Sequence, residues 1–553
     1  MRTIFFFLLI MCIPFWVKGQ VVYQHVSHKD IYDFLEELVD EEVIVVNTVV
    51  KPYSRRFIAE KLVEARDKSA KLNNRQKKEI EYYLRDYIKD LPIEQTDKKH
   101  NDILFYQWGD SVYKQEKRWD FYHYRDKRFS FTVNPVVGMH AMMNDSGLVY
   151  HRWNGAEGYA SVGEHFGFYA NLRDNYENEA FATPEYINPY TGATFKGSNR
   201  PEKTGVEYSY MRGGLMFNWD WGEIGIIKDH VVWGNNYHGS NILSGKTPSF
   251  AMIKLKLSPA SWIDFNYIHG WLVSEVVDSS RSYYYFSAPR EVFHDKYIAA
   301  NLYTIKPFRY TSFSFGNSII YSDLGVHPAY LIPFLFYKSV DHTYNSTNNY
   351  TGQNSQMFFD FSTRQLKHLH LYATLFVDEI YISKIRDTAD HSNFFSYKAG
   401  FQLSNLIPNL FFTAEYTVNR PITYEHFMPT TTFESNSYNL GSYLRHNARE
   451  IFIELKYRPF PKLTTAIGFC YAEKGPDIQY VGGAQIRGLD LIESIEWKYQ
   501  QIEFRANYQV MHDVYSFVRF RATNITGNDL QKYTPEYLQG RLNTTEVGLS
   551  WSF

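Results

Sequence analysis

The residues best suited to bind a polar ligand are concentrated between Ile227 and Gly239. This stretch holds Trp233, Asn235, Asn236, Tyr237 and His238 within six positions. Aromatic rings stack on the apolar faces of sugars, while amides and imidazoles form hydrogen bonds with hydroxyl groups. The spacing therefore predicts a polysaccharide contact at the outer mouth of the fold. A tryptophan at a membrane interface, followed by a turn rich in Gly and Asn, explains the same residues, so both interpretations stay open.

Two other groups of side chains suggest metal binding or acid–base catalysis. His368 and His370 are two residues apart, so both rings would face the same side of a strand, and Asp378 and Glu379 follow them. Together with Glu415, these carboxylates could serve as the pair that glycoside hydrolysis requires. Polar side chains facing a water-filled lumen explain the same pattern, and no Gly-x-Ser-x-Gly or zincin motif is present. We therefore expect a protein that is not an enzyme and uses no metal or cofactor.

The elements that must position these residues are clearest at the C-terminus. The segment 545–553 alternates apolar and polar residues, with Val547, Leu549, Trp551 and Phe553 on one face of a strand. An apolar stripe toward lipid and a polar stripe toward a lumen is what a transmembrane barrel strand requires. A last strand that ends on Phe also resembles the C-terminal signal of bacterial outer-membrane proteins. The alternation therefore predicts a strand of an outer-membrane barrel.

The same period of two recurs through residues 116–553. It is found at 129–134, 253–257, 263–267, 369–375, 451–457 and 502–508. At about 10 residues per strand plus turns and long loops, this region suits roughly 16 to 18 antiparallel strands. Aromatic residues make up 18% of the chain, which suits two interfacial girdles. Beyond residue 20 no apolar run reaches the about 18 residues of a membrane-spanning helix. We predict an all-β transmembrane barrel.

The N-terminal part has a different organisation. Residues 1–19 combine a basic start with an apolar run and resemble a signal peptide, after which only Cys470 remains and no intramolecular disulfide can form. Residues 20–115 contain three segments with apolar residues at helical spacing, each with a polar residue placed to cap it. They predict a small N-terminal helical bundle at the periplasmic end of the barrel.

Charge and loop composition limit the partners of the chain. The net charge of −2 argues against nucleic-acid binding. Polar stretches rich in Gly, Asn, Ser and Pro are expected to form extracellular loops, and they lie at about 174–205, 276–294, 340–356, 418–447 and 523–541. Long loops of mixed polar and aromatic character favour binding at a closed mouth, whereas a diffusion channel would favour short loops or a folded-in constriction.

Several short motifs, in order along the chain, resemble the Wzi capsule-assembly family in its Bacteroidetes form. The matching stretches are 31–35 and 52–55 in the helical part, and 134–138, 232–234, 244 with 248–250, 267–270, 330–334 and 378–380 in the barrel. The likeness spans nearly all of the mature chain, and the order of the motifs carries more weight than any one of them.

The resemblance implies a surface lectin in the cell outer membrane. Such a barrel would bind and anchor capsular or exopolysaccharide and assist capsule assembly, with outer-membrane lipid around it. A periplasmic or export-machinery partner could meet its helical end. The alternatives are a porin-like diffusion channel and, less well supported, a surface glycan hydrolase.

Overall fold

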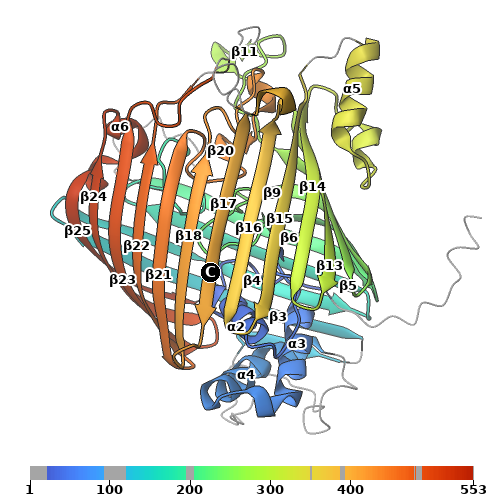
Figure 1. Ribbon diagram of the computed structural model, residues 1–553, viewed down its shortest axis with the longest axis vertical. Helices are drawn as coiled ribbons and strands as arrows, with labels where there is room; N and C mark the ends of the chain where they lie inside the picture. Colours follow the sequence, from blue (N-terminus) through green and yellow to red (C-terminus); the bar gives the residue numbers. More distant parts are fainter. Residues whose placement is uncertain are drawn as a thin grey trace, which may run out of the picture.

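The barrel predicted from alternation is present. The computed structural model describes residues 21–91, 120–126, 128–194, 205–348, 352–385, 393–478, 480 and 488–551. Within these residues, eighteen antiparallel strands form a closed barrel with short helices from the N-terminal part at one end (Figure 1). This confirms the predicted fold class, and the strand number lies within the expected range of 16 to 18.

Each barrel strand pairs with the next barrel strand along the chain, and the last pairs with the first. In chain order they are β3 (Phe129–Asn144), β4 (Gly147–Val162), β5 (Phe166–Glu177), β6 (Val206–Trp219), β7 (Gly222–Asp229), β9 (Phe250–Ala260), β10 (Ile263–Leu272), β13 (Lys296–Phe308), β14 (Thr311–Ser322), β15 (Asn354–Leu366), β16 (Leu369–Glu379), β17 (Phe394–Ser404), β18 (Leu410–Asn419), β21 (Ala448–Phe460), β22 (Leu463–Lys474), β23 (Trp497–Met511), β24 (Val514–Thr526) and β25 (Gly540–Trp551). The closing pairs run from Thr545 opposite Met143 to Trp551 opposite Val137. The short β2 (Tyr122–Arg125) pairs with the start of β3 and continues the line of β25.

The two ends of the barrel differ. At one end, here called the turn end, strands are joined by short turns such as 220–221, 261–262 and 309–310. The other end, the loop end, carries longer connections, including 230–249, 273–295 and 420–447. These connections contain the smaller elements β8 (Val232–Trp233), β11 (Tyr283–Tyr285), β12 (Ala288–Arg290), α5 (Tyr337–Asn348), β19 (Glu434–Ser435), β20 (Tyr438–Asn439) and α6 (Leu530–Tyr533).

Alternation along the strands separates an apolar outer surface from the interior. In β25, Val547 and Leu549 are exposed, whereas Glu546 and Ser550 are buried inside. The same holds around the barrel, as at Phe504 of β23, which is 44% exposed on the outside. No helix in the described part of the chain is long and apolar enough to cross a membrane. The large apolar area therefore lies on the outer surface of the strands.

Three helices form in the N-terminal part because their sequences carry both caps and apolar faces. They are α2 (Lys29–Asp40), α3 (Arg55–Asp67) and α4 (Asn74–Tyr87). Ser54 caps α3 by accepting a hydrogen bond from the backbone N–H of Phe57, and Asn73 forms a capping box with Gln76 at the start of α4. Their buried faces share one apolar core that includes Phe34 and Leu62.

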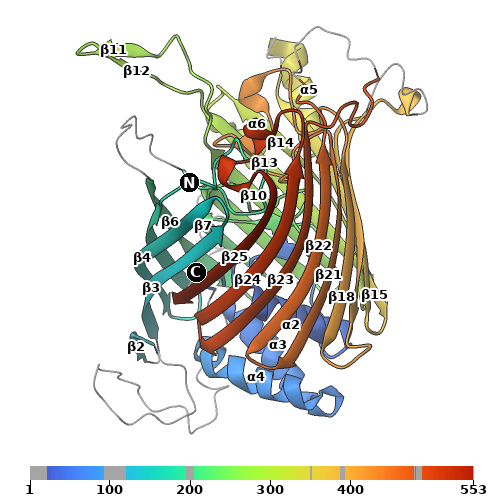
Figure 2. The ribbon, with the colours of Figure 1, turned by 90° about the vertical axis from the view of Figure 1, so that its left-hand side faces the viewer.

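The helices are joined to the turn end of the barrel by ion pairs, one buried and one half-buried. Arg364 of β15 donates a hydrogen bond to Asp40 at 2.6 Å, and Lys456 of β21 bonds Asp33 at 2.6 Å. Figure 2 shows α2, α3 and α4 against this end. The helical part is thus packed into the barrel and not a free bundle. The predicted signal peptide, residues 1–19, and the predicted boundary at 115/116 lie outside the described residues.

The lumen is packed with side chains from several parts of the chain. A single apolar cluster joins four parts of the chain: the N-terminal segment with Val49, the connection 230–249 with Trp233, strand side chains such as Phe358, and the connection 420–447 with Tyr424. At Gly167 of β5, a Cβ atom would lie 1.9 Å from the backbone oxygen of Val21, so only glycine allows this close approach. The interior is filled from both ends.

Candidate functional site

The stretch with the predicted binding residues lies inside the barrel. Residues 230–249, here called the inward segment, leave β7 and return to β9 after crossing the lumen. Gly234, with φ +109°, makes the turn after β8 in a conformation that suits glycine. Trp233 pairs with Val50 of β1 (Val50–Lys51). The backbone N–H of Trp233 donates a hydrogen bond to the carbonyl of Leu243 at 2.9 Å. Two chain segments thus form a small sheet within the lumen.

The tip of the inward segment is tied to strand β15 of the barrel wall through Asn235. Asp360 of β15 accepts the backbone N–H of Asn235 at 2.9 Å and its side-chain amide at 2.6 Å. The amide oxygen of Asn235 accepts the hydroxyl of Thr48 at 2.5 Å. Both Asn235 and Asp360 are buried, at 3% and 1% exposure. All hydrogen-bonding groups of the Asn235 side chain are therefore directed to protein partners.

Glu415 of β18 holds the next two residues. One of its carboxylate oxygens accepts the backbone N–H of Tyr237 at 2.6 Å, and the other accepts that of His238 at 3.0 Å. The same carboxylate also accepts the Tyr372 hydroxyl at 2.6 Å and the Lys398 ammonium at 2.7 Å. This buried carboxylate therefore acts as an anchor for the segment.

The rings of the inward segment stack on protein. Trp233 is fully buried and meets Phe358 edge to face at 5.9 Å, and the His238 ring stacks on Phe452 at 4.0 Å. The Tyr237 hydroxyl lies 2.8 Å from Nδ1 of His370. Burial raises the pKa of Tyr237 well above its usual range, which keeps the phenol neutral and able to donate.

The predicted position of Trp233, Asn235, Asn236, Tyr237 and His238 at the outer mouth is therefore wrong. Inside the barrel, the carboxylates of Asp360 and Glu415 accept hydrogen bonds from N–H groups of this segment, which offsets the loss of water around those groups. Trp233 and Asn235 are buried, whereas Asn236, Tyr237 and His238 are half-buried. A polymer at the cell surface cannot stack on Trp233 in this arrangement.

The alternative catalytic and metal-binding residues are separated in space. His368 lies in the turn between β15 and β16 with φ +70°, and its Nδ1 faces the carbonyl of Ser404 at 2.8 Å. His370 points into the barrel, where Arg364 donates to its Nδ1 at 3.0 Å. Asp378 accepts the backbone N–H of Tyr424 at 2.8 Å near the loop end. These groups do not converge on one site.

Among the residues that the structure describes, two other groups of three side chains have ligand atoms close enough to hold a metal ion. They are His25 with Asp229 and His230, and His238 with Glu450 and Cys470. In the first, the Arg212 guanidinium lies 3.6 Å from Asp229 and opposes a cation. In the second, the Tyr443 hydroxyl already donates to Glu450. Each set is thus engaged in protein contacts, and neither was anticipated from sequence spacing.

The loop end is closed by connections that interlock. The Tyr438 hydroxyl of β20 lies within hydrogen-bonding distance of the carbonyls of Ala182 and, at 2.8 Å, Ala193, which share its one proton. This contact joins the β5–β6 connection to the β18–β21 connection. The Ile187 N–H donates to the carbonyl of Tyr533 in α6 at 2.9 Å. The Lys246 ammonium donates to the carbonyl of Pro189. The connections thus brace one another over the mouth.

An aromatic hairpin projects from this closed end. Strands β11 and β12 form a two-stranded ribbon that extends beyond the barrel wall (Figure 2). Tyr283, Tyr284, Tyr285 and Phe286 follow one another in the sequence and are all exposed, Tyr284 at 78% and Phe286 at 88%. The guanidinium of Arg290 lies 5.8 Å from the Tyr285 ring centroid. We call residues 283–290 the aromatic hairpin.

The geometry of the hairpin displays Phe286 at its tip. Phe286 and Ser287 occupy the two central turn positions with φ values of +46° and +64°, where Gly or Asn is usually favoured. A bulky residue at positive φ costs about 1–3 kcal/mol, which indicates a reason other than stability for an aromatic side chain here. At the base, Asp278 accepts the Arg281 guanidinium at 2.5 Å and the Ser280 hydroxyl at 2.6 Å. The composition of residues 276–294 predicts an extracellular loop, but it does not by itself mark the run of four aromatic residues as a site.

Comparisons with known proteins support the fold. No protein-family model matches the chain, and no curated protein sequence matches it. Among solved structures, Wzi of Escherichia coli is similar with a TM-score of 0.56 and 11% identity, over 97% of this chain and 99% of that one. That protein is described as an outer-membrane protein involved in group 1 capsule assembly and as a carbohydrate-binding β-barrel. The chain described here thus has a Wzi-like fold.

Weaker similarities are found to two other barrels. OccAB2 of Acinetobacter baumannii has a TM-score of 0.43 and 10% identity, over 76% of this chain and 97% of that one. OprD of Pseudomonas aeruginosa has a TM-score of 0.39 and 8% identity, over 76% of this chain and 94% of that one. Similarity at this level supports no conclusion about function.

Proposed function

We propose that this protein is an outer-membrane barrel that holds capsular or exopolysaccharide at the cell surface and does not modify it chemically. The observation that carries the proposal is the combination of a packed lumen with an aromatic hairpin displayed at the closed loop end. The Wzi-like fold is consistent with this role. Assistance in capsule assembly, through contact of the helical end with a periplasmic or export partner, is part of the same proposal.

The outer surface supports a position in the outer membrane. Outward strand residues such as Leu172, Ile226 and Phe361 are apolar and more than 40% exposed. An apolar surface this extensive is costly in water and suits the hydrocarbon of a bilayer. In barrels of this kind the longer connections face outward and the short turns face the periplasm. We therefore assign the loop end to the cell surface.

Binding is better supported than diffusion or hydrolysis. A diffusion channel needs a continuous polar path, whereas here the inward segment is anchored inside the barrel to Asp360 of β15 and Glu415 of β18. A hydrolase needs two carboxylates that flank a substrate bond. Asp378 and Glu415 are instead buried and bonded to backbone N–H groups. These two carboxylates therefore hold the connections that fill the lumen and are not free to act on a substrate.

The aromatic hairpin offers what a polymer of sugars requires. Ring faces of Tyr284 and Phe286 are open to the surroundings, and phenol hydroxyls nearby can form hydrogen bonds with sugar hydroxyls. Each such contact is weak by itself. A repeating polymer that meets several copies of the protein gains avidity, which can exceed a single affinity by about 10² to 10⁴. Retention of the polymer at the surface would result.

The test is retention of polysaccharide by cells that carry the Tyr284→Ala/Phe286→Ala double variant. We expect the polymer bound to cells to fall at least threefold and the polymer in the medium to rise correspondingly. Ile382→Ala is the matched control, because Ile382 is an apolar loop-end side chain with 79% exposure and no ring. Tyr284→Phe should behave as the natural protein, since it keeps the ring.

Folding must be separated from binding in this test. Heat-modifiable migration on gels reports barrel assembly, and it should be the same for all four proteins. Normal polymer retention by a correctly assembled double variant would contradict the proposal. Equal loss in the Ile382→Ala control would also contradict it, because the effect would then not depend on aromatic rings.

A further inference from the structure

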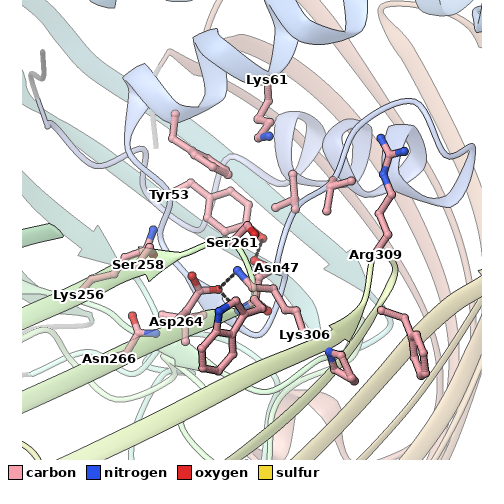
Figure 3. A pocket seen from close by; sticks show the side chains of 17 residues that line it. Asn47, Tyr53, Lys61, Lys256, Ser258, Ser261, Asp264, Asn266, Lys306 and Arg309 are labelled. Carbon is pink, nitrogen blue, oxygen red and sulfur yellow. Dashed lines mark hydrogen bonds and ion pairs between the residues drawn. The ribbon is translucent and has the colours of Figure 1, made fainter. Parts of the chain in front are cut away.

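A cavity of about 620 Å³ opens at the turn end, far from the aromatic hairpin. It lies between α3, residues 45–53 of the N-terminal segment, the β9–β10 turn and the β13–β14 turn (Figure 3). A cavity of this size falls in the range of small-molecule sites. The inward segment and the hairpin do not line it, so it is separate from the site discussed above.

The cavity combines aromatic walls with polar groups at its base. Tyr53 and Phe57 form part of the wall on the helical side, while Trp262 and Phe308 stand at the barrel rim with 56% and 66% exposure. Polar groups at the base include Asn47, whose amide donates to Asp264 of β10 at 2.8 Å. Rings beside hydrogen-bonding groups are the surroundings that a sugar unit favours.

Four cations line the same cavity, and two of them have no acidic partner among the described residues. Lys306 is paired with Asp264 at 2.8 Å, and Lys61 with Glu64 at 2.8 Å. The other two lie beside rings: the Lys256 ammonium is 5.5 Å from the Phe57 centroid and the Arg309 guanidinium 5.3 Å from the Tyr310 centroid. Glu223 of β7 is the cross-strand neighbour of Lys256, but the two form no ion pair. Asp264 is the one carboxylate in the described lining. The cavity therefore has an excess of positive charge.

We propose that this cavity binds a saccharide unit that carries a carboxylate or phosphate group. Lys256 and Arg309 would neutralise the anionic group, and the aromatic walls and Asn47 would contact the ring and its hydroxyls. This inference rests on the proposed polysaccharide function and names an acidic polymer as its ligand. The amides and serine hydroxyls at the base favour a hydroxyl-rich sugar over a lipid headgroup, whose glycerol and acyl chains would offer them few partners.

Calorimetric titration of the full-length protein in detergent micelles tests this directly. The probes are trigalacturonic acid, maltotriose as a neutral sugar of the same length, inorganic phosphate, and a short-chain phosphatidylglycerol. The variant is Lys256→Gln/Arg309→Gln. The matched control is Lys462→Gln, because Lys462 lies in another turn of the same end with its ammonium 5.2 Å from the Tyr82 centroid.

We expect trigalacturonic acid to bind at least tenfold more tightly than maltotriose, and its Kd to rise at least tenfold in the double variant. The Lys462→Gln control should bind as the natural protein does, and added salt should weaken binding. Equal affinity for the acidic and neutral sugars, or an unchanged Kd in the double variant, would overturn the inference. Binding of phosphatidylglycerol or phosphate without trigalacturonic acid would also overturn it, in favour of a lipid or a free anion.

Failure of this inference can be told apart from failure of the proposed function. The Tyr284→Ala/Phe286→Ala variant should keep its affinity for trigalacturonic acid, because the hairpin lies at the other end of the barrel. If that variant retains surface polymer while the cavity variant loses trigalacturonic acid binding, the cavity site stands and the surface function fails. The reverse pattern leaves the surface function standing and removes the cavity site.

Discussion

Asn235 and Asp360, which are 125 residues apart in the sequence, form two hydrogen bonds within the barrel at 2.9 and 2.6 Å. This pair joins the inward segment to strand β15 of the barrel wall. Thr48 adds a third connection, from the N-terminal segment, through its hydroxyl bond to Asn235. Three distant parts of the chain thus meet at one buried amide.

The first prediction concerns this contact. Asp360→Ala removes both acceptors and leaves two buried N–H groups of Asn235 unpaired, which should lower the free energy of unfolding by about 1–3 kcal/mol. Asp360→Asn keeps the shape and one acceptor oxygen, so its loss should be smaller. Urea unfolding of the protein in micelles measures the difference. Equal stability of the alanine variant and the natural protein would show that the pair is not a constraint on the fold.

The second prediction concerns the closed lumen. The natural protein should show no steady open-channel current in planar bilayers, because the inward segment and the N-terminal segment fill the interior. Replacing residues 235–241 with a short Gly-Ser-Gly linker removes the part of the segment that fills the lumen, so this variant should conduct current. The Trp233–Leu243 bridge lies outside the replaced residues and can still close the shortened loop. Shortening the aromatic hairpin, which does not enter the lumen, is the control and should leave the current unchanged. A porin-like current in the natural protein would contradict this prediction.

The third prediction is a pH dependence that arises at His230. Burial lowers the pKa of His230 from 6.5 to about 4 in the folded protein. Between these values the unfolded chain binds a proton that the folded chain does not, so stability is complete above pH 6.5 and falls as the pH decreases toward 4. The slope is up to about 1.4 kcal/mol per pH unit. His230→Gln should reduce the slope of unfolding free energy between pH 6.5 and 4.5. The same slope in both proteins would contradict the assignment.

The fourth prediction concerns the joint between helices and barrel. Arg458 of β21 forms buried ion pairs with Glu37 of α2, at 3.3 Å, and with Glu79 of α4. Arg75 also pairs with both carboxylates. Arg458→Gln therefore leaves them partly compensated and should lower the free energy of unfolding by less than the about 3–5 kcal/mol of an uncompensated buried charge. The N-terminal segment should then be cleaved faster by protease added to permeabilised cells. Arg66→Gln on the exposed side of α3 is the control, because its guanidinium has no buried partner and is 49% exposed. Equal cleavage of the two variants would refute a role of the ion pairs in docking.

Much of the architecture could be read from local patterns. Alternation in 545–551 predicts which side chains face outward, and Val547 and Leu549 are indeed exposed while Glu546 is buried. Capping residues likewise predict helices, as Asn73 does at the start of α4. These predictions succeed because strand pleating and helix periodicity depend on neighbours within a few residues. Such local patterns indicate on which face of its own strand or helix a side chain lies.

The candidate sites depend on contacts that local patterns do not contain. Tyr283–Phe286 is visible in the sequence as a run of four aromatic residues, but only the turn geometry places Phe286 at an exposed tip. The cavity is likewise formed by α3 and two turns more than 190 residues away in the chain, around Lys256 and Arg309. The spacing of residues within α3 does not indicate that these two turns will lie beside it, and the turns likewise contain no pattern that points to α3.

The barrel, its apolar exterior and the helical N-terminal part can all be predicted from the chain alone, because each follows from periodicity within short segments. The paths of the loops depend on contacts between distant segments. The segment around Trp233 has the composition of a surface turn, and it enters the lumen because Asp360 and Glu415 on distant strands bind its amide groups more favourably than an exposed loop tip would allow. A loop is buried when the hydrogen bonds that it gains with other strands offset the free-energy cost of removing water from its polar groups. Those strands come near the loop only when the barrel closes.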